Sequence, residues 1–168
     1  IILFEGWHGS LRGTLVNRLL SALDPRGFKV YSASKTDCNY KEKPYFAPFW
    51  SELPPKGAFS IYNGSWYYRK MEKEVRSQSE KNKEKEDETS YEDINIFERQ
   101  LTDDGYLIVK IFLHISQQKQ KKNWEKLEKI YGKEWHKVTS DQEEPRAYDD
   151  YYSVYEKMFD ATDKNNAV

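Results

Sequence analysis

The hydrophobic residues of this chain fall into short apolar runs that alternate with segments of helical spacing. Four of the runs predict buried strands: 1–5, 28–32, 59–62 and 106–113. Four segments with apolar residues three and four positions apart predict helices: 13–23, 91–101, 116–133 and 148–159. Strands that alternate with helices are typical of an α/β fold with a central parallel sheet. Ligands bind at the carboxyl ends of such strands, so we expect the loops after Glu5, Tyr62 and Leu113 to line one cleft.

One stretch lacks any such pattern. Between residues 70 and 90 nearly every position is charged or polar. The stretch is therefore either a solvated helix with ion pairs four residues apart or a mobile insertion. Without an apolar face, periodicity does not decide between the two.

The composition limits the partners and the compartment. At 168 residues the chain is long enough for a single domain, and its formal net charge of −1 gives no overall attraction to nucleic acid or to an anionic membrane. No apolar run approaches the roughly 20 residues that span a bilayer. Cys38 is the only cysteine, which excludes an intrachain disulfide and fits the cytoplasm. The chain stops at 165–168 without a closing element, so we expect 1–168 to be one truncated domain of a longer polypeptide.

A glycine-containing loop lies between the first strand and the first helix. Its sequence over 5–13 is EGWHGSLRG, and a strand, a glycine loop and a helix in succession are the context of a phosphate-binding P-loop. Gly6, Arg12 and Gly13 are the candidate phosphate-binding residues. The usual Gly-Lys pair is however Leu11-Arg12, and neither Ser nor Thr stands at position 13. The loop therefore has the setting of a P-loop without its usual chemistry.

Several further motifs resemble the polyphosphate kinase 2 family. They lie at 23–28 (LDPRGF), 49–57 (FWSELPPKG), 65–67 (SWY), 97–105 (FERQLTDDG), 108–116 (IVKIFLHIS), 149–151 (DDY) and 162–163 (TD). The match runs over nearly the whole chain. The resemblance implies a P-loop kinase fold like that of thymidylate kinase, a three-layer sandwich with a helical lid at about 117–147. It also implies phosphoryl transfer between inorganic polyphosphate and AMP or ADP, with Mg²⁺ as cofactor.

Family members typically carry G-x-D-A-A-G-K-G in the first loop, and this chain departs from that motif. His8 stands in place of the Asp, and a histidine is neutral or cationic where an anion is expected. Leu11 replaces a glycine that lets backbone amides approach phosphate. Arg12 replaces the Lys, and a planar guanidinium does not substitute freely for an ammonium. Arg12 either still holds an anion or is an exposed arginine at a helix start.

The second family motif, F-D-R-S-W-Y, is also altered. Asn63 replaces the Asp, and Gly64 replaces the Arg. A neutral amide is a weaker ligand than a carboxylate for Mg²⁺, so we expect weak or absent magnesium binding and assign no metal ligand. Removal of one preorganised charge contact costs about 100- to 1,000-fold in rate. Family motif residues are replaced at His8, Arg12, Asn63 and Gly64, and these are the degenerate positions. We therefore expect no intact set of catalytic residues.

Basic residues of the lid bind the polyphosphate chain in this family. The candidates here are Lys121, Lys122, Lys137 and Arg146, whereas Asn123 stands near an expected Arg. Acidic residues are interspersed among them, so a solvated helix of mixed charge is the other interpretation.

Three hypotheses follow. The chain is a catalytically degraded copy that supports an intact catalytic domain in the same polypeptide or in a homo-oligomer, since the family includes such tandem proteins. Alternatively, it is a divergent but active phosphotransferase, in which Arg12 grips phosphate and Glu5 supplies metal contacts. The third hypothesis is a module that binds polyphosphate and has no affinity for nucleotides. None of the three involves a membrane or a nucleic acid.

Overall fold

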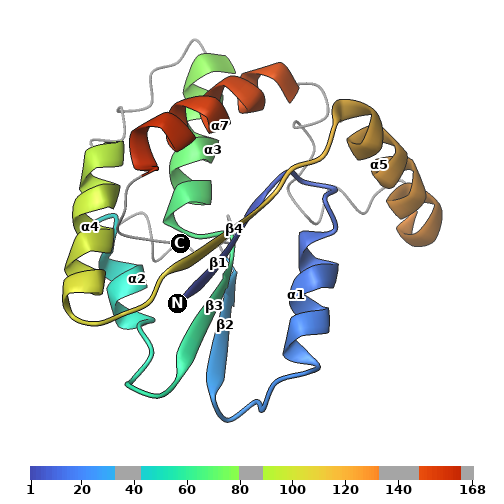
Figure 1. Ribbon diagram of the computed structural model, residues 1–168. Coiled ribbons are helices and arrows are strands. Elements are labelled where there is room, and N and C mark those ends of the chain that lie inside the picture. The colour runs from blue at the N-terminus through green and yellow to red at the C-terminus, as the bar shows by residue number, and fades with distance from the viewer. Residues whose placement is uncertain (33–42, 80–88, 133–147, 164–168) are drawn as a thin grey trace.

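Four parallel strands form the centre of the molecule. The computed structural model describes residues 1–32, 43–79, 89–132 and 148–163. The strands are β1 (Ile2–Gly6), β2 (Phe28–Ser32), β3 (Phe59–Asn63) and β4 (Val109–Leu113), in the order β2-β3-β1-β4 (Figure 1). Every neighbouring pair is parallel, which confirms the predicted α/β fold with a central parallel sheet.

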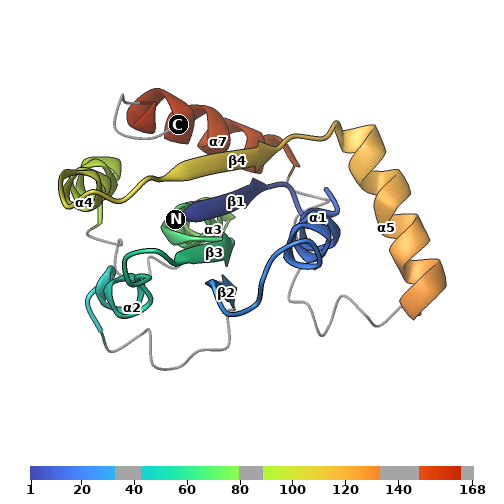
Figure 2. The ribbon, with the colours of Figure 1, turned by 60° about the horizontal axis from the view of Figure 1, so that its bottom comes forward.

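Helices cover both faces of the sheet. The helices are α1 (Arg12–Leu20), α2 (Ala47–Ser51), α3 (Trp66–Ser79), α4 (Tyr91–Asp103), α5 (Gln117–Tyr131) and α7 (Tyr148–Thr162). Helix α1 lies on one face, and α3 and α7 lie on the other (Figures 1 and 2). Among the described helices, none is both long and apolar enough to span a membrane.

Alternation along the strands supplies both faces with hydrophobic residues. Leu3 and Tyr62 belong to the larger core cluster, with residues of α3, α4 and α7. Their neighbours Phe4 and Ile61 belong to the smaller cluster, with Val16 of α1. Successive side chains of a strand point to opposite faces, so two short runs contribute to both layers at once.

The strand predicted at 106–113 is shorter than expected, because β4 covers only Val109–Leu113. Pairing starts at Val109, whose N–H donates to Ile1 O at 2.9 Å, and not at residue 106. The charged amino terminus of Ile1 donates to Leu107 O at 2.7 Å. Among the described residues, no strand pairs with the stretch 106–108. Tyr106 instead donates from its hydroxyl to Pro54 O at 3.1 Å.

The charged stretch after residue 70 is partly a packed helix. Helix α3 continues to Ser79, and Lys70 and Glu74 form an ion pair four residues apart at 3.7 Å, so the helical alternative describes this part. The helix is not solvated all round, because it buries Met71 and Val75. One of the charged residues of this helix, Glu74, makes contacts with other helices. Its carboxylate accepts from Tyr91 Oη at 2.7 Å and from Lys157 Nζ at 3.0 Å, and these contacts join α3 to α4 and α7. Residues 80–88 lie outside the described part.

Candidate functional site

The carboxyl ends of three strands meet at the glycine loop, as the sequence predicts. Gly64, which follows β3, donates its N–H to Phe4 O of β1 at 2.9 Å. Trp7, which follows β1, donates its N–H to Leu113 O of β4 at 3.3 Å. The three loops therefore lie together at one end of the sheet, beside the start of α1 (Figure 1).

The loop adopts a backbone that favours glycine at three positions. Gly6 and Gly9 have φ values of 122° and 76°, and Leu11 has a φ of 64°. Leu11 is the residue that stands where the family carries glycine. A left-handed conformation costs a non-glycine residue about 1–2 kcal/mol, so the chain keeps the loop geometry at the expense of strain.

Arg12 and Asn63, two of the degenerate positions, contact each other. Arg12 Nε donates to Asn63 Oδ1 at 2.7 Å, and Arg12 Nη1 donates to Gly6 O at 3.3 Å. The guanidinium also lies 5.5 Å from the ring centre of Tyr68. The alternative of an exposed arginine at a helix start is therefore wrong, because Arg12 is half-buried and bonded within the loop.

His8 joins a chain of polar side chains that sequence reasoning missed. The hydroxyl of Tyr68 donates to Glu72 Oε1 at 2.5 Å and lies 3.1 Å from His8 Nε2. Because the single hydroxyl hydrogen is directed to Glu72, the geometry assigns the hydrogen of the other contact to His8 Nε2. Tyr68 and Glu72 lie one turn apart on α3, a spacing that brings side chains together. Family motifs alone did not draw attention to this pair.

Glu5 is fully buried under the loop. Its Oε1 accepts from Ser65 N–H at 2.7 Å and from Ser65 Oγ at 2.6 Å. Burial raises the pKa of the Glu5 carboxyl, and the nearby Arg12 charge and the Ser65 bonds oppose that rise. Burial thus works against the anionic form of Glu5.

The side chains around the loop do not fit a magnesium ion. Mg²⁺ prefers carboxylate oxygens in a nearly ideal octahedral arrangement. Asn63 Oδ1 is bonded to Arg12, and Glu5 is buried and bonded to Ser65. In the described ranges no three side chains of His, Cys, Asp and Glu are grouped as metal ligands. This donor set gives no support to Glu5 as a metal ligand, the role that the active-enzyme hypothesis assigns to it.

Changing Glu5 to Gln will remove a pH-dependent contribution to stability. A carboxyl whose pKa is raised on folding stabilises the fold below its unfolded pKa of about 4.5, and that contribution is lost as the pH rises through the folded pKa. Gln keeps an oxygen for Ser65 but does not titrate. Urea unfolding from pH 4 to 8 should show Glu5→Gln gaining on the parent protein as the pH rises. A constant difference between the two proteins would contradict the burial of a neutral carboxyl.

Helix α5 packs directly on the loop. Gln120 Nε2 donates to His8 O at 3.2 Å, and Asn123 Nδ2 donates to Gly9 O at 2.7 Å. Gln120, Asn123 and Trp124 are the buried residues of this helix, whereas Tyr131 is 68% exposed. The packed face of the helix predicted at 116–133 therefore includes Trp124 and does not extend to Tyr131. The side-chain amides of Gln120 and Asn123 attach the helix to the loop, because the loop presents backbone carbonyl groups as acceptors.

The predicted lid cations divide into two groups. Lys121 and Lys122 are exposed on α5. Lys137 and Arg146 lie outside the described residues, and so does Cys38. The other two candidate residues, Gly13 and Gly64, lie in the first turn of α1 and directly after β3.

His114 follows β4 and is exposed. It nevertheless positions the loop. Trp7 is buried and donates from Nε1 to His114 Nδ1 at 3.2 Å. The Trp7 ring also stacks on Tyr148 of α7, with ring centres 4.1 Å apart. These contacts tie the loop to β4 and α7.

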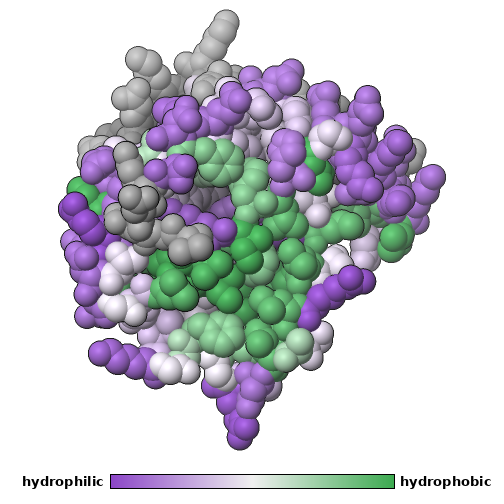
Figure 3. Space-filling view, in the orientation of Figure 1, coloured by the Kyte–Doolittle hydropathy of each residue, from purple (hydrophilic) through white to green (hydrophobic). Residues whose placement is uncertain are grey.

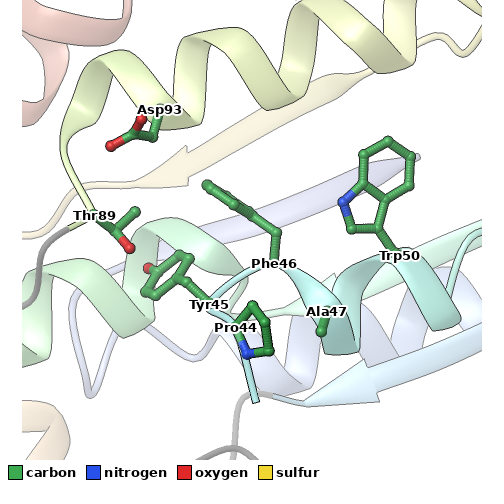
Figure 4. Close-up of a pocket in the computed structure, with 7 residues that line it drawn as sticks. All are labelled: Pro44, Tyr45, Phe46, Ala47, Trp50, Thr89 and Asp93. Carbon is green, nitrogen blue, oxygen red and sulfur yellow. The ribbon is translucent and has the colours of Figure 1, made fainter.

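A separate hollow lies between α2 and the start of α4. Its lining combines aromatic rings with one carboxylate: Pro44, Tyr45, Phe46, Ala47, Trp50, Thr89 and Asp93 (Figure 4). The carboxylate of Asp93 accepts from Ser90 N–H at 2.7 Å as part of the helix cap. None of the glycine-loop residues lines this hollow.

Comparison with known proteins points to one family. The family model of polyphosphate kinase 2 matches residues 1–168. The polyphosphate:AMP phosphotransferase of Pseudomonas syringae pv. tomato is 30% identical over 162 residues, which are 96% of this chain and 32% of that protein. The corresponding protein of Pseudomonas aeruginosa is 30% identical over 99% of this chain and 33% of its own length. The chain thus spans about a third of these relatives.

A solved structure agrees with the sequence matches. The crystal structure of polyphosphate kinase 2 from Arthrobacter aurescens TC1 superposes with a TM-score of 0.85 at 25% identity. The superposition covers 99% of this chain and 58% of that one. The four-stranded parallel sheet with its helices is therefore the arrangement found in polyphosphate kinase 2 structures.

Proposed function

Because the chain belongs to the polyphosphate kinase 2 family, we propose that it is a polyphosphate-binding domain whose own phosphoryl transfer is impaired. Relatives are polyphosphate:AMP phosphotransferases and polyphosphate phosphotransferases that act on ADP, GDP or NDP. The proposed ligands are accordingly inorganic polyphosphate and, with reduced affinity, AMP or ADP.

One observation carries the proposal of impaired transfer: the bond of 2.7 Å between Arg12 and Asn63. Phosphoryl transfer depends on positioning and on neutralisation of the phosphate charge. The family resemblance places a lysine and a carboxylate at these two positions. Here the cation of the loop is bonded to a neutral amide, which cannot organise a metal ion as a carboxylate does. Family kinases are generally magnesium-dependent, and this donor set is poor for magnesium.

The outer face of α5 supports polyphosphate binding. Its lysines are exposed while the amides of Gln120 and Asn123 hold the other face on the loop: Lys119, Lys121, Lys122, Lys126 and Lys129. A row of lysines near the loop offers a flexible polyanion several contacts without a bound metal. We propose that an intact catalytic domain, in the same polypeptide or in another subunit, uses the polyphosphate held here. The greater length of the relatives leaves room for such a domain.

A turnover assay tests the impaired transfer. The purified chain is mixed with Mg²⁺, polyphosphate and either AMP or ADP, and the product nucleotide is measured. We expect no robust turnover, because at least three charge contacts are changed together. Robust turnover that is lost in Arg12→Ala would contradict the proposal and favour the divergent but active phosphotransferase.

Polyphosphate binding will depend steeply on salt and on the lid lysines. Each neutralised phosphate releases a counterion, as in nucleic-acid complexes, so the affinity falls as salt rises. Lys121→Glu with Lys122→Glu should weaken binding about tenfold or more at low salt, measured by fluorescence anisotropy of labelled polyphosphate. The matched control is Lys29→Glu on β2, an exposed lysine at the opposite edge of the sheet. If the double variant and the parent protein bind polyphosphate with equal affinity, the lysines of α5 do not bind it.

A further inference from the structure

The positive charge of Arg12 lacks an acidic partner among the groups that its side chain bonds. Nε donates to Asn63 Oδ1 at 2.7 Å and Nη1 donates to Gly6 O at 3.3 Å, and both acceptors are neutral. A guanidinium carries five N–H groups, so three of them have no acceptor in the part of the chain that the structure describes. Arg12 is half-buried, and an anion with oxygen acceptors would complete its bonding.

Glu5 does not supply that anion. Its carboxylate lies near enough to interact with the charge of Arg12, but its Oε1 is bonded to Ser65. Burial raises the pKa of the Glu5 carboxyl and so favours its neutral form. The family resemblance places Asp at positions 8 and 63, and His8 and Asn63 carry no negative charge there. The side chains of the loop therefore leave the charge of Arg12 uncompensated.

The start of α1 adds backbone donors beside this charge. Leu11 stands at the N-cap without a side-chain capping bond, and Leu15 N–H donates to Leu11 O at 3.0 Å. The preceding amides, those of Arg12, Gly13 and Thr14, have no acceptor among the described residues. The first turn also carries no acidic residue. Unpaired amides at the start of a helix favour a bound anion.

The loop also contains a buried hydroxyl with no partner. Ser10 is 9% exposed, and its Oγ makes no hydrogen bond to any residue that the structure describes. Because buried polar groups in native proteins are nearly always bonded, this hydroxyl indicates a missing partner. Gly13 borders open space, since a Cβ added there would meet no atom within 4 Å. The start of α1 therefore has room for a ligand.

We propose that the loop binds a phosphate group directly through Arg12, without a divalent cation. The proposal rests on the proposed function, in which polyphosphate is the ligand, and it places one end of that chain at the start of α1. A phosphate offers oxygen acceptors both to the guanidinium fork and to the unpaired amides of the helix. Mg²⁺ would bring further positive charge to Arg12, and the described residues contain no group of three His, Cys, Asp or Glu side chains to hold it.

Helix α5 connects this site to the rest of a polyphosphate chain. Gln120 and Asn123 attach the helix to the carbonyl groups of the loop, and mainly hydrophilic side chains cover α5 in Figure 3. Lys121 and Lys122 are among its exposed residues. A polyphosphate that these lysines hold lies beside the loop, and its terminal phosphate is the group that we assign to Arg12.

Calorimetric titration of the 168-residue chain with inorganic tripolyphosphate in EDTA tests the proposal. The parent protein should bind, and Mg²⁺ should weaken binding or leave it unchanged, because the magnesium complex of tripolyphosphate carries less negative charge. Asn63→Asp keeps an acceptor for Arg12 but adds a negative charge beside it. This variant should bind about tenfold or more weakly in EDTA. Mg²⁺ should then raise its affinity, since carboxylate and phosphate oxygens together suit that ion. The matched control is Asn17→Asp, the same change at an exposed residue of α1, which should bind like the parent protein.

NMR of the unsubstituted protein gives a second readout that does not depend on a variant folding. The side-chain Nε–H signal of Arg12 and the backbone amide signal of Gly13 should shift when tripolyphosphate is added in EDTA. AMP, which carries a single phosphate group of lower charge, should shift them only at higher concentration. Tighter binding of AMP than of tripolyphosphate would overturn the assignment of the loop to the end of a polyphosphate chain.

Three other results would overturn the proposal: binding of tripolyphosphate only with Mg²⁺, equal affinity of Asn63→Asp and the parent protein in EDTA, or binding that leaves the Arg12 and Gly13 signals unchanged. The proposed function fails on a different result, the loss of long-polyphosphate binding to the lysines of α5. If long polyphosphate binds through Lys121 and Lys122 while tripolyphosphate does not bind in EDTA, the proposed function stands and the direct phosphate site at Arg12 is wrong.

Discussion

Glu98→Ala will lower the free energy of unfolding by about 3–5 kcal/mol, because two buried donors and the partly buried ammonium of Lys110 lose their acceptor together. Glu98 is 2% exposed, and its carboxylate bonds to three side chains. Lys110 Nζ lies 2.6 Å from Oε2, Tyr67 donates its hydroxyl to Oε1 at 2.7 Å, and Trp66 Nε1 donates to Oε1 at 3.1 Å. Burial and the charge of Glu98 raise the pKa of Tyr67, which keeps that hydroxyl a donor.

Urea unfolding at neutral pH measures this loss, and a neighbouring residue gives the control. Arg99→Ala alters the next position of α4, which is exposed, and should change stability by less than about 0.5 kcal/mol. The double variant Glu98→Leu with Lys110→Met replaces both charges by apolar groups and should recover much of the loss. If Glu98→Ala costs less than about 1 kcal/mol, the network does not stabilise the fold in the way that its burial implies.

The sequence predicts the layers of this fold well because they depend on local periodicity. Runs such as 59–62 alternate between the two faces, and the structure uses that alternation directly. The role of Glu98 is different. The stretch 97–105 served as a family motif, but the partners of Glu98 at Trp66 and Tyr67 are 32 and 31 residues away. Spacing along the chain cannot show that these side chains meet.

The contacts within the candidate site could likewise not be predicted from spacing along the chain. Altered motifs identified Arg12 and Asn63 separately, and only the folded loop brings them within 2.7 Å across a separation of 51 residues. The sequence singles out Asn123 only as a residue near an expected Arg, and it does not single out Gln120, because amides in a lysine-rich helix are usually solvated. Their burial follows from the loop carbonyls above them, which only the tertiary structure positions.

Gly6→Ala will destabilise the protein by about 3 kcal/mol or more, because both the conformation and the space at this position exclude a side chain. Gly6 has a φ of 122°. A Cβ there would lie 2.4 Å from Leu113 O and 2.7 Å from Leu113 N. Both are backbone atoms of the paired strand β4, so they cannot move aside as a flexible side chain would. The end of β1 must separate from β4, and the bond from Trp7 N–H to Leu113 O is lost.

Gly13→Ala provides the matched control within the same loop motif. A Cβ at Gly13 would meet no atom within 4 Å, and the residue lies in the first turn of α1. Alanine is favoured over glycine in a helix by about 0.5–1 kcal/mol, so this variant should be slightly more stable than the parent protein. Thermal unfolding of the two variants should therefore move in opposite directions. If both were destabilised alike, the motif would be sensitive to any added methyl group, and the close approach of Gly6 to β4 would not explain the loss.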